Sequence, residues 1–332
     1  MANGGIIGPV QVVSNEIELP EKITSILSSG TFTVQCASSG GTRTGDILVV
    51  GGGGAASPGC RTGGGGAGGF RLLSCQTFVT TGISVTIGGG GVGGPTPNKT
   101  GENTVFANPG NPITSAGGGT SQGWVNPGTA GGSGGGGSGY GPIGSGSGGA
   151  GNTPPVSPSQ GNAGGSGKSS PGPGGGGGGG GASAVGANAP PTIGAGGAGS
   201  PVTPVFGNAP QPFYLSNVTA TGNTACGHFA GGGGGGGCHP GSITVAGGIG
   251  GGGGGNGGPG GNGTNARANS GGGGGGNYNT PADYVKGGSG IVLVKEDAVT
   301  VTASSIPGVW SMNSVYEYVK DDTVSYTHLR AH

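Results

Sequence analysis

Two cysteines and two histidines in the second half of the chain are the residues whose types fit a metal site. Cys226, His228, Cys238 and His239 offer thiolate and imidazole groups, the usual ligands of Zn²⁺, on either side of a glycine run. Their spacing matches no standard zinc-binding pattern. We therefore expect surface or packing residues here, and no bound metal.

Two further short motifs resemble parts of enzyme sites. Residues 50–56, Val-Gly-Gly-Gly-Gly-Ala-Ala, contain the Gly-x-Gly-x-x-Ala pattern of dinucleotide-binding turns, but residues 57–59, Ser-Pro-Gly, stand where the required helix would begin. Lys168 precedes two serines, without a nearby carboxylate or histidine to activate a nucleophile. We expect no cofactor at either motif.

Charged residues are scarce along the whole chain. Eleven Lys and Arg balance eleven Asp and Glu, and only 7% of residues carry a charge. Between Asn103 and Ala282 the only formal charges are Lys168 and Arg267, so the paired carboxylates of a glycosidase are absent there. A nucleic-acid binder would need a basic patch, which this chain lacks. We expect neither an enzyme nor a partner of nucleic acid.

Glycine dominates the composition, with 97 glycines and 24 prolines among 332 residues. Such a fraction without a period normally indicates low complexity or disorder. Disorder driven by self-repulsion needs net charge, however, and the formal net charge is +0. An uncharged sequence with scattered apolar residues favours a packed chain.

Neither a secretory signal nor a membrane span is visible, because the longest apolar runs are the four residues 47–50 and 291–294. We therefore expect synthesis in a host cytoplasm and no membrane insertion. Five cysteines, an odd number at irregular spacing, argue against a fully paired disulfide framework and favour free thiols.

Strands are expected mainly at the two ends of the glycine-rich part, and glycine follows nearly all of them. A helix is expected near residues 310–319, with Ser311 as its N-cap. The expected strands are residues 31–34, 46–50, 70–73, 83–87, 242–245 and 290–294.

Long glycine tracts fill the middle of the chain, at residues 174–181, 231–237, 250–255 and 271–276. A polyproline II helix leaves its backbone N–H and C=O groups pointing outward, and only glycine lets several such helices approach on all sides. We favour a bundle of these helices over a disordered tangle. The expected fold is mainly β with a polyglycine II bundle and little helix.

An ordered series of strand-plus-glycine blocks resembles the glycine-rich domain of bacteriophage tail-fibre and appendage proteins. The blocks are residues 28–34, 46–54, 63–70, 83–91 and 287–294, and the resemblance covers about residues 22–295. Residues 2–9 and 308–318 also resemble phage structural proteins. The resemblance implies a polyglycine II sandwich whose loops bind an outer-membrane protein or a glycan. An additional N-terminal strand set departs from this pattern and leaves open a β-sandwich with glycine-rich insertions.

Four segments are expected along the chain. Residues 1–21 form an N-terminal segment, 22–295 the glycine-rich domain, and 296–324 a C-terminal segment with the short helix. Residues 325–332, Ser-Tyr-Thr-His-Leu-Arg-Ala-His, resemble a translated sequencing adapter. We leave these eight residues out of any functional argument.

Aromatic and histidine side chains of the middle are the candidates for receptor binding, because they provide contact area on an otherwise smooth, uncharged surface. The alternative is that they pack as lids over the bundle ends. The candidates are Trp124, Tyr140, Phe213, Tyr214, His228, Phe229 and Tyr278.

The sequence therefore leads to a virion protein of a phage tail fibre or similar appendage. Its expected partners are a host cell-surface receptor and other tail or fibre proteins. One rival within this class is a structural fibre component that spaces or caps other proteins. A rival of a different class is a cellular glycine-rich surface or ice-binding protein, although the chain lacks the regular Thr or Ala repeat of an ice-binding face.

Overall fold

A computed structural model describes most of the chain. The described residues are 16–35, 42–92, 100–140, 144–168, 174–189, 193–208, 211–214, 227–238, 243–258, 261–278 and 285–302. Among them, no helix has the length and apolar character needed to cross a membrane. The expected helix near residues 310–319 and two of the cysteines, Cys36 and Cys226, lie outside this set.

The chain divides into two compact units. The first comprises Met1–Pro20 and Ala298–His332, and its described part is an antiparallel pair of β1 (Glu16–Leu19) and β16 (Val299–Thr302). The second unit, Glu21–Asp297, holds the remaining elements.

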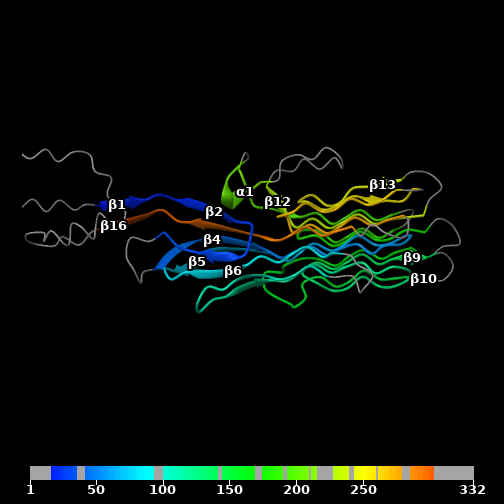
Figure 1. The fold of residues 1–332 in the computed structure, drawn as a ribbon, viewed down its shortest axis with the longest axis horizontal. Coiled ribbons are helices and arrows are strands. Elements are labelled where there is room, and N and C mark those ends of the chain that lie inside the picture. The colour runs from blue at the N-terminus through cyan, green and yellow to red at the C-terminus, as the bar shows by residue number, and fades with distance from the viewer. Residues whose placement is uncertain are drawn as a thin grey trace, which may run out of the picture. The chain divides into compact units, whose positions relative to one another are not determined.

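Two four-stranded antiparallel sheets lie in the second unit (Figure 1). The first has the order β2 (Lys22–Ile26), β15 (Ile291–Glu296), β4 (Thr42–Val50), β5 (Phe70–Val79). The second has the order β3 (Gly30–Phe32), β6 (Ile83–Thr86), β7 (Thr104–Phe106), β8 (Ile113–Ser115).

Both sheets contribute side chains to one hydrophobic core. Ile47 and Val49 of β4 pack there with Phe32, Phe78 and Phe106, all buried. The rings of Phe78 and Phe106 meet edge to face, with centroids 5.8 Å apart. The two sheets therefore form a sandwich, which agrees with the alternative of a β-sandwich carrying glycine-rich insertions.

The other face of the first sheet is also buried. Leu48, Val50, Ile291 and Leu293 pack against a second cluster around the four-residue helix α1 (Thr203–Phe206). Successive residues of a strand point to opposite faces, so a strand covered on both sides needs apolar residues throughout. The continuous apolar runs of β4 and β15 follow from this double coverage.

A buried ion pair joins the two central strands of this sheet, β4 and β15, near one end of each. Arg43 Nη1 lies 3.4 Å from Glu296 Oε1, and the two side chains are 2% and 0% exposed. Glu296 Oε1 also accepts a hydrogen bond from Gln35 N (2.7 Å), and Arg43 donates to the carbonyl of Asp297. These hydrogen bonds offset part of the cost of burying two charges.

The glycine segments continue from the strands as extended chains that run side by side (Figure 1). Successive N–H groups of one segment donate to different neighbours: Gly51 to Gly69, Gly52 to Glu102, Gly53 to Gly288, and Gly54 to Gly66. Gly51 and Gly54 thus bond the same neighbouring segment. The hydrogen bonding therefore repeats every three residues, unlike the two-residue repeat of a β-sheet.

Neighbouring glycine segments run in both directions. Gly64 and Ala67 donate to Gly177 and Gly180, so these two segments are parallel. From the same segment, Gly65 donates to Gly274 and Gly68 to Gly271, so that neighbour is antiparallel. Each segment can thus be held by several others at once.

At many interior positions of this packing only glycine fits. A Cβ atom placed on Gly65 would lie 2.1 Å from the carbonyl oxygen of Gly54, and one on Gly179 would lie 1.9 Å from that of Gly65. Both distances are far below van der Waals contact. The glycine content of the middle is therefore a packing requirement.

Three two-stranded antiparallel pairs complete the second unit. They are β9 (Gly139–Tyr140) with β10 (Gly144–Ser145), β11 (Ser200–Pro201) with β12 (His228–Phe229), and β13 (Thr244–Val245) with β14 (Gly255–Asn256). The described chain is mainly β with a single four-residue helix, which confirms the predicted mainly β class.

Candidate functional site

The glycine segments have two distinct ends. Strand β4 leads directly into glycines 51–54, the chain turns at residues 55–62, and residues 63–69, six glycines and Ala67, lead back into β5. The turn therefore lies at the end opposite the sheets, which we call the far end; the end that joins the sheets is the near end. Strands β9, β10 and β13 lie toward the far end (Figure 1).

Backbone hydrogen bonds bring several chain turns together at the far end. Gly236 N donates to Thr62 O (2.7 Å), and Gly139 N donates to Arg61 O (3.1 Å). Lys168 N donates to Gly175 O (2.9 Å). The preceding residue, Gly174, lies beside Arg61, because a Cβ atom added to Gly174 would be 3.3 Å from Arg61 Nη1. Arg61 and Lys168 are cations at this end, and the described residues around them include no carboxylate.

Trp124 stands out at the far end because its side chain is 66% exposed. Its backbone has φ +64°, a left-handed conformation that a bulky residue rarely adopts. The flanking chain is anchored, since Asn126 O accepts from Ser138 N (3.3 Å) and Gln122 O accepts from Ser138 Oγ. The loop thus holds a large apolar side chain in solvent on a fixed backbone.

Two tyrosines of the candidate set also lie at the far end. Tyr140 is in β9, directly after Gly139; only its backbone is described. Tyr278 follows Asn277, whose N–H donates to Thr62 Oγ1 (2.9 Å). A hydrogen bond with Cys238 raises the pKa of the Tyr278 hydroxyl. The far end therefore gathers three of the seven candidate residues.

The other four candidates lie at the near end, around α1. Phe229 is fully buried and Tyr214 is 8% exposed, with its hydroxyl donating to Gly207 O (2.6 Å). Phe213 packs edge to face on Tyr214, with ring centroids 4.9 Å apart. Phe229 and Tyr214 were expected as solvent-facing candidates, and this is corrected, because both side chains belong to the second hydrophobic cluster. Phe213 and His228 are partly exposed.

The potential metal ligands are divided between the two ends. His228 precedes the glycine segment 231–237 at the near end, and Cys238 follows it at the far end. These two side chains cannot share one ion, and no group of three potential ligands occurs within the described ranges. Cys226 and His239 lie outside them.

Residues 50–56, which match the dinucleotide pattern, are built into the glycine packing. The N–H groups of Gly51, Gly52, Gly53 and Gly54 all donate to backbone carbonyls of neighbouring segments. A phosphate would need these same donors. The turn that follows them leads to the far end and to no helix.

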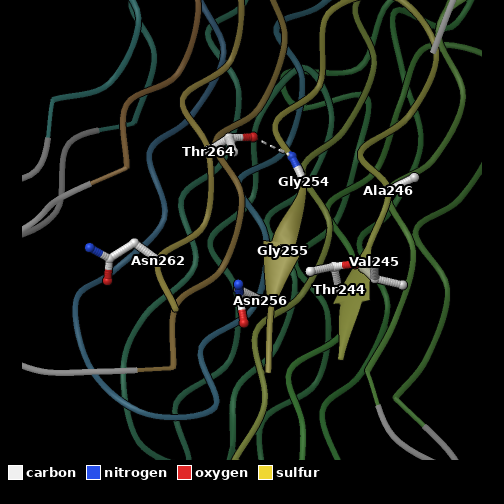
Figure 2. A pocket seen from close by; sticks show the side chains of 8 residues that line it. All are labelled: Thr244, Val245, Ala246, Gly254, Gly255, Asn256, Asn262 and Thr264. Carbon is white, nitrogen blue, oxygen red and sulfur yellow. Dashed lines mark hydrogen bonds between the residues drawn. The ribbon is translucent and has the colours of Figure 1, made fainter. Parts of the chain in front are cut away.

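A polar hollow of about 280 Å³ lies beside the far end, next to the paired strands β13 and β14. Its wall is formed by Thr244, Val245, Ala246, Gly254, Gly255, Asn256, Asn262 and Thr264 (Figure 2). Thr264 Oγ1 accepts a hydrogen bond from Gly254 N (2.8 Å), which fixes one side of the wall. Amides and hydroxyls line this hollow without a formal charge, so it suits a neutral, polar ligand.

Arg61, Lys168 and the polar hollow were not predicted as parts of a site. Their position in the sequence could have indicated them, because these residues stand where a glycine segment ends or turns. No family model matches the chain, and a search of curated proteins finds no similar sequence. The function must therefore be argued from the far end itself.

Proposed function

We propose that the glycine segments form a polyglycine II bundle. The threefold repeat of hydrogen-bond partners, the mixture of parallel and antiparallel neighbours and the lack of room for Cβ atoms all support this assignment. Such a bundle carries loops at its free end on a backbone fixed from several sides.

On this scaffold, we propose a virion protein of a phage tail fibre or similar appendage whose far end binds a receptor on the host cell. The observation that carries the proposal is the exposed Trp124, which is held on an anchored loop among converging chain turns. Function commonly resides on loops that a rigid scaffold positions.

The exposed Trp124 and the uncharged hollow favour a glycan or a polar surface of an outer-membrane protein, and Arg61 and Lys168 suit an acidic group on that surface. An exposed aromatic ring provides contact area at low entropic cost, and neutral amides and hydroxyls provide adaptable hydrogen bonds. The sandwich at the near end is suited to joining other tail or fibre proteins. In this role the chain is a binding and structural component and performs no catalysis.

The test is binding of the purified, labelled protein to a panel of bacterial cells and to their isolated outer membranes. Trp124→Ala should weaken binding at least tenfold, as loss of a central aromatic contact does. Val185→Ala is the matched control, because Val185 is 63% exposed but lies in the turn after glycines 174–181 at the near end. Equal effects of the two substitutions would refute the role of the far end.

A further inference from the structure

Two cysteines 178 positions apart in sequence, Cys60 and Cys238, are brought to the same level of the far end. Gly233 N donates to Gly65 O, and Gly236 N donates to Thr62 O. One segment advances by three residues while the other goes back by three. The two segments are thus antiparallel in a fixed register. Cys60 lies in the turn two residues before Thr62, and Cys238 stands two residues after Gly236, so both cysteines lie at this end of the two segments.

The two thiols influence each other. Besides burial, the proximity of Cys238 raises the pKa of the Cys60 thiol, and Cys238 also raises the pKa of the Tyr278 hydroxyl. Both thiols are partly exposed, so a small reagent can reach them. By contrast, Cys75 is an exposed cysteine in β5, on the sheets.

We propose that Cys60 and Cys238 are a redox-controlled cross-link, which closes to a disulfide when the protein meets a low-molecular-weight disulfide. This inference concerns the far end itself and does not depend on the proposed receptor binding. In the structure both cysteines are free thiols, as the sequence predicts, and the proposal concerns their oxidation.

The chemistry is ordinary thiol–disulfide exchange. One thiol loses its proton, and its thiolate attacks the reagent disulfide, forming a mixed disulfide and releasing one reagent thiolate. The second cysteine, also deprotonated, then attacks the protein sulfur of that mixed disulfide and releases the second reagent thiol. Two protein thiols are oxidised to one disulfide, and one reagent disulfide is reduced to two thiols.

The surroundings set the rate of this step. Burial, followed by the nearby Cys238, raises the pKa of the Cys60 thiol, while Arg61 acts in the opposite direction. Tyr278 is the other titratable group that faces the pair. Because the thiolate is the attacking species, cross-linking is slow at neutral pH and accelerates as the pH rises toward and above 9.

The closed form ties together the turn before glycines 63–69 and the turn after glycines 231–237. Closing so long a loop restricts the unfolded chain strongly. We expect the oxidised protein to unfold about 5 to 10 °C above the reduced protein. The reduced protein, with both thiols intact, is the internal reference.

The experiment incubates the folded, full-length chain with oxidised glutathione at pH 8.5, then blocks free thiols and maps the peptides without reduction. Trypsin releases Cys60 in residues 44–61, and cleavage after Phe229 separates Cys238 from Cys226. The expected product links Cys60 to Cys238 and reverts on reduction. Cys75→Ser should leave this product unchanged, and Cys238→Ser should abolish it.

Three results would overturn the proposal. One is a dominant link from either cysteine to Cys36 or Cys226. Another is persistence of both free thiols in a chain whose circular dichroism shows that it is folded. The third is protection of both thiols by added Zn²⁺ that a chelator reverses, together with no disulfide after metal removal.

Discussion

Adding one methyl group inside the glycine packing should unfold the protein at a markedly lower temperature. In Gly65→Ala, the new Cβ lies 2.1 Å from Gly54 O and 3.0 Å from Gly274 N. Relieving the contact with Gly54 requires a shift of about 1 Å, because non-bonded carbon and oxygen atoms sit roughly 3.2 Å apart or more.

The shift disturbs hydrogen bonds that are already short and well placed. Gly54 donates to Gly66 (2.8 Å) and accepts from Gly274 (3.0 Å), while Gly65 donates to Gly274 (2.8 Å) and accepts from Gly233 (2.8 Å). Losing two or three such bonds, with their groups left buried, costs about 3 to 5 kcal/mol. For a chain of this size that lowers the melting temperature by about 4 to 7 °C.

Gly30→Ala is the matched control for this substitution. Gly30 lies in β3, is exposed, and has no atom within 4 Å of an added Cβ. The control should leave stability unchanged or raise it by about 0.5 kcal/mol, because alanine restricts the unfolded chain. Thermal unfolding followed by circular dichroism measures both variants. Equal melting temperatures for Gly65→Ala and Gly30→Ala would refute the close packing.

Two other predictions concern buried polar groups. Arg43→Met leaves the Glu296 carboxylate buried without its cation, so the free energy of unfolding in urea should fall by about 3 to 5 kcal/mol. Glu21→Ala removes the partly exposed Lys295–Glu21 pair (3.1 Å) and should change the free energy of unfolding by at most about 1 kcal/mol. Burial raises the pKa of the Tyr214 hydroxyl in the folded chain. The protonated hydroxyl therefore contributes to stability below about pH 10, and this contribution is lost as the pH rises through the folded pKa. The free energy of unfolding should fall less steeply above pH 10 in Tyr214→Phe than in the parent chain.

The sheets could be predicted where apolar residues are continuous. Residues 46–50 and 290–294 lie in β4 and β15, whose two buried faces require such runs. Strands β7 and β8 were missed, because each has only three residues, too few to show a two-residue period. The short helix α1 was missed for the same reason.

The candidate site could be predicted only in part. An aromatic residue in a glycine-rich chain is easily noticed. Whether it lies at the near or the far end depends on how many glycine segments precede it in the chain. Trp124 follows an outward segment and is exposed, whereas Phe229 precedes one and is buried by α1. The sequence holds no local signal for this direction.

Hydrogen–deuterium exchange of the glycine segments tests the central claim most directly. Amides of residues 51–54, 63–69 and 231–237 all donate hydrogen bonds within the packing or at its ends, and we predict protection comparable to that of β4 and β15. Exchange of these glycine amides within seconds, while β4 and β15 stay protected, would contradict the ordered bundle and with it the fixed presentation of the far end.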